Sequence, residues 1–416
     1  MRRLRIAVYH NLRPGGALRA LDELLRRSCA THDYDLFESA RSVVDRAAAG
    51  MGLALDSSCR SHHVFEMPEL PMASVKLGHA HVLRQVWQLE RLESEIAGAI
   101  DAGGYDLAFV HPCHVRYTPA ILTKLRTPVV YYMQEARRPT FEYRVRHRRR
   151  ASWGRGATGA ARSLAVLSGA LAEPVLVRGD QQAARAPGVY VLANSAFSAE
   201  RILASYGVPA HVSYLGVDAE RFHPGSDGAP VADARPYVVS VGRGVAAKRH
   251  DLVIEALGAL PEATRPELVI AGEGPATAYE DHLRDTAAEL GVAVRLLRAV
   301  DDEGLVDLYR RAVVTVCAAE LEPFGLTVLE SISCGTPVVA VREGGFRESV
   351  RDGVTGLLVE PTARGLSDGV ARVLADPGRY DPRSLHASIA ADAWTWDDAA
   401  ARLHGHFAAA SDERAR

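Results

Sequence analysis

Cysteine and lysine are both scarce in this chain of 416 residues. The five cysteines are odd in number and far apart, and none belongs to a Cys-x-x-Cys pair or a Cys/His cluster at metal-binding spacing. Because disulfide frameworks and zinc sites need such pairs, we expect reduced, mostly buried thiols in a cytoplasmic protein. Three lysines, Lys76, Lys124 and Lys248, occur among 49 basic residues, so a lysine inside a motif is informative.

Long apolar runs and a large net charge are also missing. No segment reaches the roughly 18 apolar residues that a membrane span needs. The run after Arg2 and Arg3 lacks the features of a signal peptide. The formal net charge of −2 argues against a general polyanion binder, so nucleic acid is not expected as a partner.

Positive charge is concentrated in one segment, from Arg137 to Arg162, which contains nine arginines and one acidic residue, Glu142. Three interpretations remain open. The segment is a solvated surface loop, it binds a phosphorylated or carboxylated acceptor, or it contacts anionic lipids at about 1 kcal/mol per basic residue. The last would bring a cytoplasmic protein to the inner face of the membrane through a peripheral contact.

Short β-rich runs alternate with helical patterns along the chain, as at 237–241 followed by 249–260. This order predicts α/β domains with parallel sheets covered on both faces, and the length exceeds one compact core. A polar stretch rich in Gly and Pro suits a linker. We predict two Rossmann-like domains that face each other across a cleft. The N-terminal domain, at 1–220, binds the acceptor, and the C-terminal domain, at 237–392, binds the donor. A linker at 221–236 joins them, and a last helix at 393–416 packs back toward the N-terminal domain.

The turn after the strand at 237–241 reads Gly242-Arg243-Gly244-Val-Ala-Ala-Lys248. Glycine permits close approach of the backbone to a diphosphate, Arg243 offers a planar fork for phosphate, and Lys248 adds a compact charge. An ordinary strand-to-helix turn with exposed basic residues is the alternative. We interpret the turn as a candidate phosphate-binding site.

A second motif, Glu322-Pro-Phe-Gly-Leu-Thr-Val-Leu-Glu330, follows a buried-strand run at 313–317. Gly325 opens a predicted helix, whose first N–H groups and dipole favour an anion. Glu322 precedes this helix, and Glu330 lies on its second turn, on the same stripe as Thr327. One carboxylate could accept hydrogen bonds from sugar hydroxyls and the other from a ribose, although helical glutamates are more often solvated surface residues.

Taken together, these motifs resemble the retaining glycosyltransferases of family 4, which have the GT-B fold. The resemblance rests on Gly242-Arg243, on Lys248, on the E-x7-E element from Glu322 to Glu330, and on Glu343-Gly-Gly-Phe-Arg-Glu348. It is dense over residues 190–360 and looser elsewhere, where Pro14-Gly15-Gly16 also fits it. The fold that it implies agrees with the two domains predicted from the alternation of strands and helices.

The resemblance implies transfer of a hexose or N-acetylhexosamine from a UDP- or GDP-sugar to an acceptor hydroxyl. The implied step is a front-face displacement with retention of configuration, for which no metal or other cofactor is required. Arg243, Lys248 and Glu322 would be catalytic, the two cations binding the diphosphate and Glu322 the transferred sugar, while Glu330 would hold the ribose. Further donor contacts are implied for Gly15, Gly16, Gly242, Arg298, Val300, Phe324, Gly325, Leu326 and Thr327.

The acceptor side departs from the family pattern. Where many relatives place a histidine near the sugar, this chain has Gln134, which cannot shuttle a proton. Glu135 could take that place or could pair with a neighbouring arginine, and Arg138 is itself an acceptor-side candidate. His111, at the end of another strand, is a further candidate sugar contact, although such histidines are more often structural. A cell-envelope glycan, a glycolipid and a secondary metabolite are all compatible acceptors.

Two other functions remain open. A nucleotide-sugar epimerase of the same architecture would convert the donor without any acceptor. A non-catalytic, nucleotide-binding partner subunit would keep the fold without the chemistry. The sequence spacing indicates no cluster of histidines and carboxylates suited to a divalent ion, so no metal site is predicted.

Overall fold

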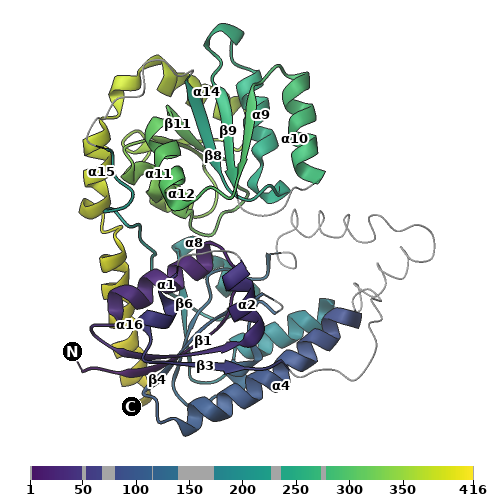
Figure 1. The fold of residues 1–416 in the computed structure, drawn as a ribbon, viewed down its shortest axis with the longest axis vertical. Coiled ribbons are helices and arrows are strands. Elements are labelled where there is room, and N and C mark those ends of the chain that lie inside the picture. Colours follow the sequence, from purple (N-terminus) through teal and green to yellow (C-terminus); the bar gives the residue numbers. More distant parts are fainter. Residues whose placement is uncertain are drawn as a thin grey trace, which may run out of the picture. The chain divides into compact units, whose positions relative to one another are not determined.

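The computed structural model describes residues 2–48, 53–67, 80–114, 116–138, 173–225, 236–272 and 278–415. They divide into two compact units, one drawn from Met1–Tyr214 together with Ala400–Arg416 and the other from Leu215–Ala399. In each unit helices pack around a central sheet (Figure 1).

The first unit contains a seven-stranded parallel sheet with the strand order β3-β2-β1-β4-β5-β6-β7. Ile6 of β1 lies opposite Tyr34 of β2 and Leu107 of β4. The strands are β1 (Arg5–Asn11), β2 (Asp33–Ser39), β3 (Ser61–Phe65), β4 (Leu107–Cys113), β5 (Val129–Tyr132), β6 (Val189–Ala193) and β7 (His211–Val212). The helices with described bounds are α1 (Gly16–Ser28), α2 (Ala40–Ala48), α3 (Leu55–Ser58), α4 (Ala80–Ala102), η1 (Ala120–Thr123), α8 (Ala196–Tyr206) and α16 (Trp396–Ala415).

Both faces of this sheet are buried, because side chains of a strand alternate between its faces and helices cover each one. On one face α4 presents apolar residues at helical spacing, and they pack with Ala108 and Val110 of β4: Leu89, Leu92, Ile96 and Ile100. On the other face Phe407 of α16 meets Phe109 edge to face, with ring centroids 5.2 Å apart. The end of the chain therefore completes the core of the first unit.

The second unit contains a six-stranded parallel sheet with the order β10-β9-β8-β11-β12-β13. Its strands are β8 (Tyr237–Val241), β9 (Glu267–Gly272), β10 (Val294–Arg298), β11 (Val314–Cys317), β12 (Val338–Val341) and β13 (Gly356–Val359). The main helices are α9 (His250–Gly258), α10 (Ala278–Glu289), α11 (Asp302–Arg311), α12 (Leu326–Ser333), α13 (Phe346–Ser349), α14 (Ala363–Ala375) and α15 (Pro382–Ala391), with the short turns η2 (Ala246–Lys248), η3 (Glu262–Thr264) and η4 (Pro377–Arg379).

The strand order of the second unit reverses at β8, which lies between β9 and β11. Loops leave such a switch point in opposite directions, and this opens a crevice beyond the carboxyl ends of the strands. The predicted class, α/β with parallel sheets covered on both faces, is confirmed. Within the described ranges, no helix is both long enough and apolar enough to cross a membrane.

Candidate active site

The turn that follows β8 is shaped by glycine. Gly242 has a φ of 153°, and a Cβ added there would lie 3.1 Å from Cδ of Lys248. A Cβ on Gly272, at the end of β9, would lie 2.4 Å from the carbonyl oxygen of Gly242. The sequence needs glycine at both positions because two strand ends and the Lys248 side chain approach each other here. Arg243, at the tip of this turn, is exposed.

Lys248 and Glu322, both predicted to be catalytic, are in direct contact. Nζ of Lys248 lies 2.8 Å from Oε2 of Glu322, and both side chains are partly exposed, at 26% and 21%. The two residues line one pocket at the ends of β8 and β11, together with His250, Thr327 and Phe346. A cation and a carboxylate at the mouth of one pocket can bind a ligand that is both anionic and rich in hydroxyls.

The loop that carries Glu322 is held against the loop after β12. The backbone N–H of Gly345 donates to the carbonyl of Glu322 at 2.7 Å, and a Cβ on Gly344 would lie 2.3 Å from the same oxygen. Gly325 caps α12 with a φ of 92°, and a Cβ there would lie 2.6 Å from the ring of Phe346. The glycines of both loops therefore permit the approach that sets Glu322 at the start of α12.

Phe324, Leu326 and Thr327 surround this helix start. Phe324 is buried and packs at a tilt on Trp394, with ring centroids 5.8 Å apart. Leu326 and Thr327 are half-buried in the first turn of α12. The first N–H groups of an α-helix have no partner within the helix, so this end of α12 suits an anion.

Glu330 lies one turn further along α12 and is half-buried. The hydroxyl of Tyr309, on α11, donates to Oε2 of Glu330 at 2.8 Å. Sequence reasoning missed Tyr309, because a tyrosine on the apolar stripe of a helix is typical of ordinary core packing.

A second pocket lies at the ends of β8, β9 and β10 and is lined by Gly242, Gly244, Glu280, Leu297 and Arg298 among others. Arg298 forms an ion pair with Glu280, and the hydrogen bond that its guanidinium donates to the Glu280 carboxylate raises the pKa of the arginine. Glu280, from α10, was also missed by sequence reasoning, since nothing in its neighbourhood resembles a motif. Val300, the second residue predicted in this loop, is half-buried two positions beyond Arg298.

The other predicted site residues belong to the first unit and lie at the carboxyl edge of its sheet. Gly15 caps α1 with a φ of 143°, and Gly16 begins that helix. Three of the acceptor-side candidates follow β5, where Gln134 is buried and Glu135 and Arg138 are half-buried, and the fourth, His111, lies within β4.

His111 is fully buried rather than open to a ligand. Its ring meets Phe109 edge to face with centroids 4.4 Å apart, and burial holds its pKa well below the ordinary value, so it is neutral.

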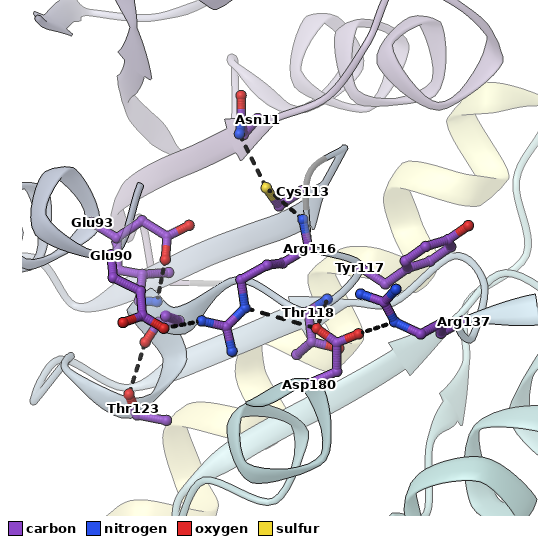
Figure 2. A network of polar contacts seen from close by, with 12 residues as sticks. Asn11, Glu90, Glu93, Cys113, Arg116, Tyr117, Thr118, Thr123, Arg137 and Asp180 are labelled. Carbon is purple, nitrogen blue, oxygen red and sulfur yellow. Dashed lines mark hydrogen bonds and ion pairs between the residues drawn. The ribbon is translucent and has the colours of Figure 1, made fainter. Parts of the chain in front are cut away.

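Arg137, the first residue of the basic segment, is not a surface residue. It is 2% exposed, forms an ion pair with Asp180, and stacks over Tyr117 at 4.7 Å. Figure 2 shows Arg116 approaching the same carboxylate from the other side, and Nε of Arg116 lies 3.9 Å from Oδ1 of Asp180. Neither solvation nor lipid contact applies to Arg137. Residues 139–162, the remainder of that segment, lie outside the described residues.

A cluster around the buried carboxylate of Glu38 was not predicted either. Nε2 of His62 lies 2.7 Å from Oε1 of Glu38, and a guanidinium nitrogen of Arg46 lies 2.9 Å from the same atom. Asp56 contacts both of these partners, while burial lowers the pKa of the neighbouring His10 to about 3. These residues come from separate strands and helices, so no spacing in the sequence connects them. Arg46 already supplies a positive charge to the carboxylates.

Two parallel α/β units, each with its candidate residues at the carboxyl edge of its sheet, define the GT-B fold. Solved structures of this fold cover almost the whole chain. Sucrose-phosphate synthase from Thermosynechococcus elongatus has a TM-score of 0.71 at 18% identity, covering 97% of this chain and 98% of that chain. The Anabaena protein HepE in complex with UDP-glucose has a TM-score of 0.70 at 19% identity, covering 98% and 100%. At such identities the likeness shows the fold alone.

Residues 227–390, which lie within the second unit, match the family model of the glycosyl transferases group 1. A D-inositol 3-phosphate glycosyltransferase of Geodermatophilus obscurus is 35% identical over 242 residues, which is 54% of this chain and 53% of that protein. Its counterpart in Mycolicibacterium gilvum is 37% identical over 217 residues, 49% and 48% of the two chains. The chain thus spans about half the length of these relatives.

Proposed function

We propose that this protein is a retaining glycosyltransferase that transfers a hexose or N-acetylhexosamine from a UDP- or GDP-sugar to an acceptor hydroxyl. The observation that carries the proposal is the 2.8 Å contact between Lys248 and Glu322 beside the start of α12. The contact joins the cation that we propose for phosphate to the carboxylate that we propose for sugar hydroxyls, at the switch point of a parallel sheet, and this supports the proposal. The relatives named glycosyltransferases and the neighbour solved with UDP-glucose support the same assignment.

In the proposed complex the diphosphate lies between the Gly242 turn and the start of α12. Lys248 has three N–H donors, so it can keep its contact with Glu322 while donating to a phosphate oxygen. Arg243, exposed on the turn, is free to swing onto the diphosphate with its planar fork. Glu330 accepts hydrogen bonds from the ribose hydroxyls, and the pocket beside Arg298 takes the base.

The proposed reaction occurs on one face of the sugar. The bond between the anomeric carbon and the diphosphate oxygen breaks while the acceptor oxygen bonds to that carbon from the same side. Because the acceptor bonds from the side that the diphosphate leaves, configuration is retained, and the acceptor proton passes to the departing phosphate oxygen, so the charges balance. Lys248 and Arg243 stabilise the developing negative charge, and each such contact is worth about 3 kcal/mol in comparable sites. Because protein cations supply this stabilisation, the step needs no metal.

Turnover of nucleotide sugars tests the proposal. Thermal stabilisation by UDP, GDP and ADP identifies the base, since a saturating ligand stabilises the folded state by a few kcal/mol. Hydrolysis or transfer from the matching nucleotide sugars is then measured, with D-inositol 3-phosphate as the first acceptor because the curated relatives are named for it. Lys248→Ala and Glu330→Ala should both lose most turnover. Lys124→Ala, which removes a lysine of the first unit, is the matched control.

Three results would contradict the proposal. Unchanged turnover in Lys248→Ala and Glu330→Ala would overturn the site. Conversion of the donor to its epimer without acceptor would indicate an epimerase, and failure of calorimetry to detect binding of any of the three nucleotides would indicate a non-catalytic subunit.

We place the activity in the cytoplasm, in line with the reduced, buried thiols of Cys113, Cys317 and Cys334.

A further inference from the structure

The contact between Tyr309 and Glu330 joins two helices of the second unit. Tyr309 is fully buried on α11, and its hydroxyl donates to Oε2 of Glu330 on α12 at 2.8 Å. We propose that Tyr309 is a positioning residue that fixes the Glu330 carboxylate for recognition of the donor ribose. This inference rests on the proposed function, in which Glu330 binds the ribose.

Tyr309 is held firmly enough to serve this role. Its ring lies at 62° to that of Phe222, with centroids 6.3 Å apart. The hydroxyl of Thr336 donates to the backbone carbonyl of Tyr309 at 2.6 Å. Both the ring and the backbone of Tyr309 therefore have fixed partners, and its hydroxyl reaches Glu330 from a rigid base.

Burial keeps Tyr309 in the donor state. It raises the pKa of the phenol well above its ordinary value, and the neighbouring charge of Glu330 raises it further. At neutral pH the hydroxyl therefore carries its proton. A neutral donor beside a carboxylate gives a charge-assisted hydrogen bond, which is about twice as strong as one between neutral groups.

The consequence for the ligand follows from the geometry of a carboxylate. The last torsion of a glutamate is broad and roughly two-fold, so without a fixed partner the plane of its carboxylate is poorly defined. Two adjacent ribose hydroxyls need both oxygens in one plane. A donor on Oε2 fixes that plane before the nucleotide arrives, which reduces the ordering cost of binding. The part of the affinity that depends on Tyr309 should therefore come from the ribose hydroxyls.

The chain offers a matched control. Tyr237 is another buried tyrosine of the second unit, and its hydroxyl donates to the backbone carbonyl of Leu308, next to Tyr309, at 2.8 Å. Tyr237→Phe therefore removes a buried tyrosine hydroxyl that contacts the same helix without touching Glu330. It reproduces the structural effect of Tyr309→Phe and leaves the proposed positioning intact.

Calorimetry of the whole protein with UDP, GDP and ADP, and with their 2′-deoxy and 3′-deoxy forms, tests the inference. Tyr309→Phe should weaken binding of the best ribonucleotide roughly tenfold, as expected for loss of a hydrogen bond to a charged group. Binding of the deoxy forms should weaken much less, so the preference for ribose over deoxyribose falls. Glu330→Gln should lower the same preference, and adding Tyr309→Phe to it should change nothing further. Tyr237→Phe should leave the preference as in the wild type.

The outcomes separate the inference from the proposed function. If Glu330→Gln lowers the preference for ribose but Tyr309→Phe behaves like Tyr237→Phe, the positioning role is wrong and the donor site remains. If the wild type binds none of the nucleotides, or Glu330→Gln leaves the preference unchanged, the proposed donor site is wrong and the inference fails with it. The preference is the ratio of two dissociation constants, for the ribonucleotide and its deoxy form, measured on one preparation. An unfolded fraction of a variant affects both measurements equally, so it does not change the ratio.

Discussion

Nζ of Lys248 and Oε2 of Glu322 lie 2.8 Å apart although 74 positions separate the two residues. Lys248 ends the turn after β8, and Glu322 precedes α12, so the contact joins the two motifs that the sequence singled out. Neither side chain is deeply buried, so a ligand can reach both. This contact makes the two motifs parts of one site.

The first prediction concerns the charge of Lys248. Lys248→Met keeps the length of the side chain and removes the cation, so kcat should fall roughly 100-fold through loss of stabilisation of the leaving diphosphate. Steady-state turnover of the nucleotide sugar measures this. Lys124→Met is the control and should be unaffected. Equal kcat values for Lys248→Met and the wild type would show that the cation is not used in the transition state.

The second prediction concerns Gly325, which begins α12 with a φ of 92°. Gly325→Ala should destabilise the second unit by about 1–3 kcal/mol, because L residues are strained there and the new Cβ would lie 2.6 Å from the ring of Phe346. Chemical denaturation measures the change. Gly378→Ala is the control, since a Cβ at Gly378 meets nothing within 4 Å. A stability change of the same size in both variants would contradict the role of Gly325.

The fold and the local structure of the two glycine-containing motifs could be predicted because their signals are local. The turn from Gly242 to Lys248 and the helix start at Gly325 are continuous stretches in which residue type and conformation are directly linked. Alternation of strand and helix patterns likewise indicates parallel sheets, whichever strands pair. The predicted helix from Gly325 agrees with α12, Leu326–Ser333.

What the sequence could not reveal depends on distant pairs. Arg137 belongs to a run of arginines that resembles a solvated segment, yet it pairs with Asp180, 43 positions away, in the interior of the first unit. Tyr309 contacts Glu330 through two helices whose packing no spacing encodes. His111 follows the predicted strand in a pattern suited to a ligand, but β4 continues to Cys113 and is buried almost throughout, so His111 lies in the core.

The third prediction concerns Asp180, which is fully buried and which both Arg137 and Arg116 approach (Figure 2). Asp180→Asn leaves two guanidinium groups near a neutral amide, and loss of one partner of a buried ion pair costs about 3–5 kcal/mol of stability. Denaturation of the first unit measures it. Asp45→Asn, which removes an exposed partner of Arg41, should cost less than about 1 kcal/mol. Similar losses in both variants would show that the buried network contributes little.

The last prediction concerns pH and His250, which is buried beside the turn and bonded to Ser240 through Nδ1 at 3.0 Å. Burial, together with the charge of Lys248, lowers the pKa of His250 from 6.5 to about 4. Between these values the unfolded chain binds a proton that the folded one does not. The contribution of the neutral His250 to stability is therefore fully present above pH 6.5 and is lost as the pH falls toward 4, at up to about 1.4 kcal/mol per pH unit.

Denaturation across this range should give a shallower dependence of the free energy of unfolding on pH for His250→Gln than for the wild type. His282→Gln, at an exposed position on α10, should keep the wild-type slope. Equal slopes for all three proteins would mean that His250 does not contribute to the acid sensitivity of the second unit.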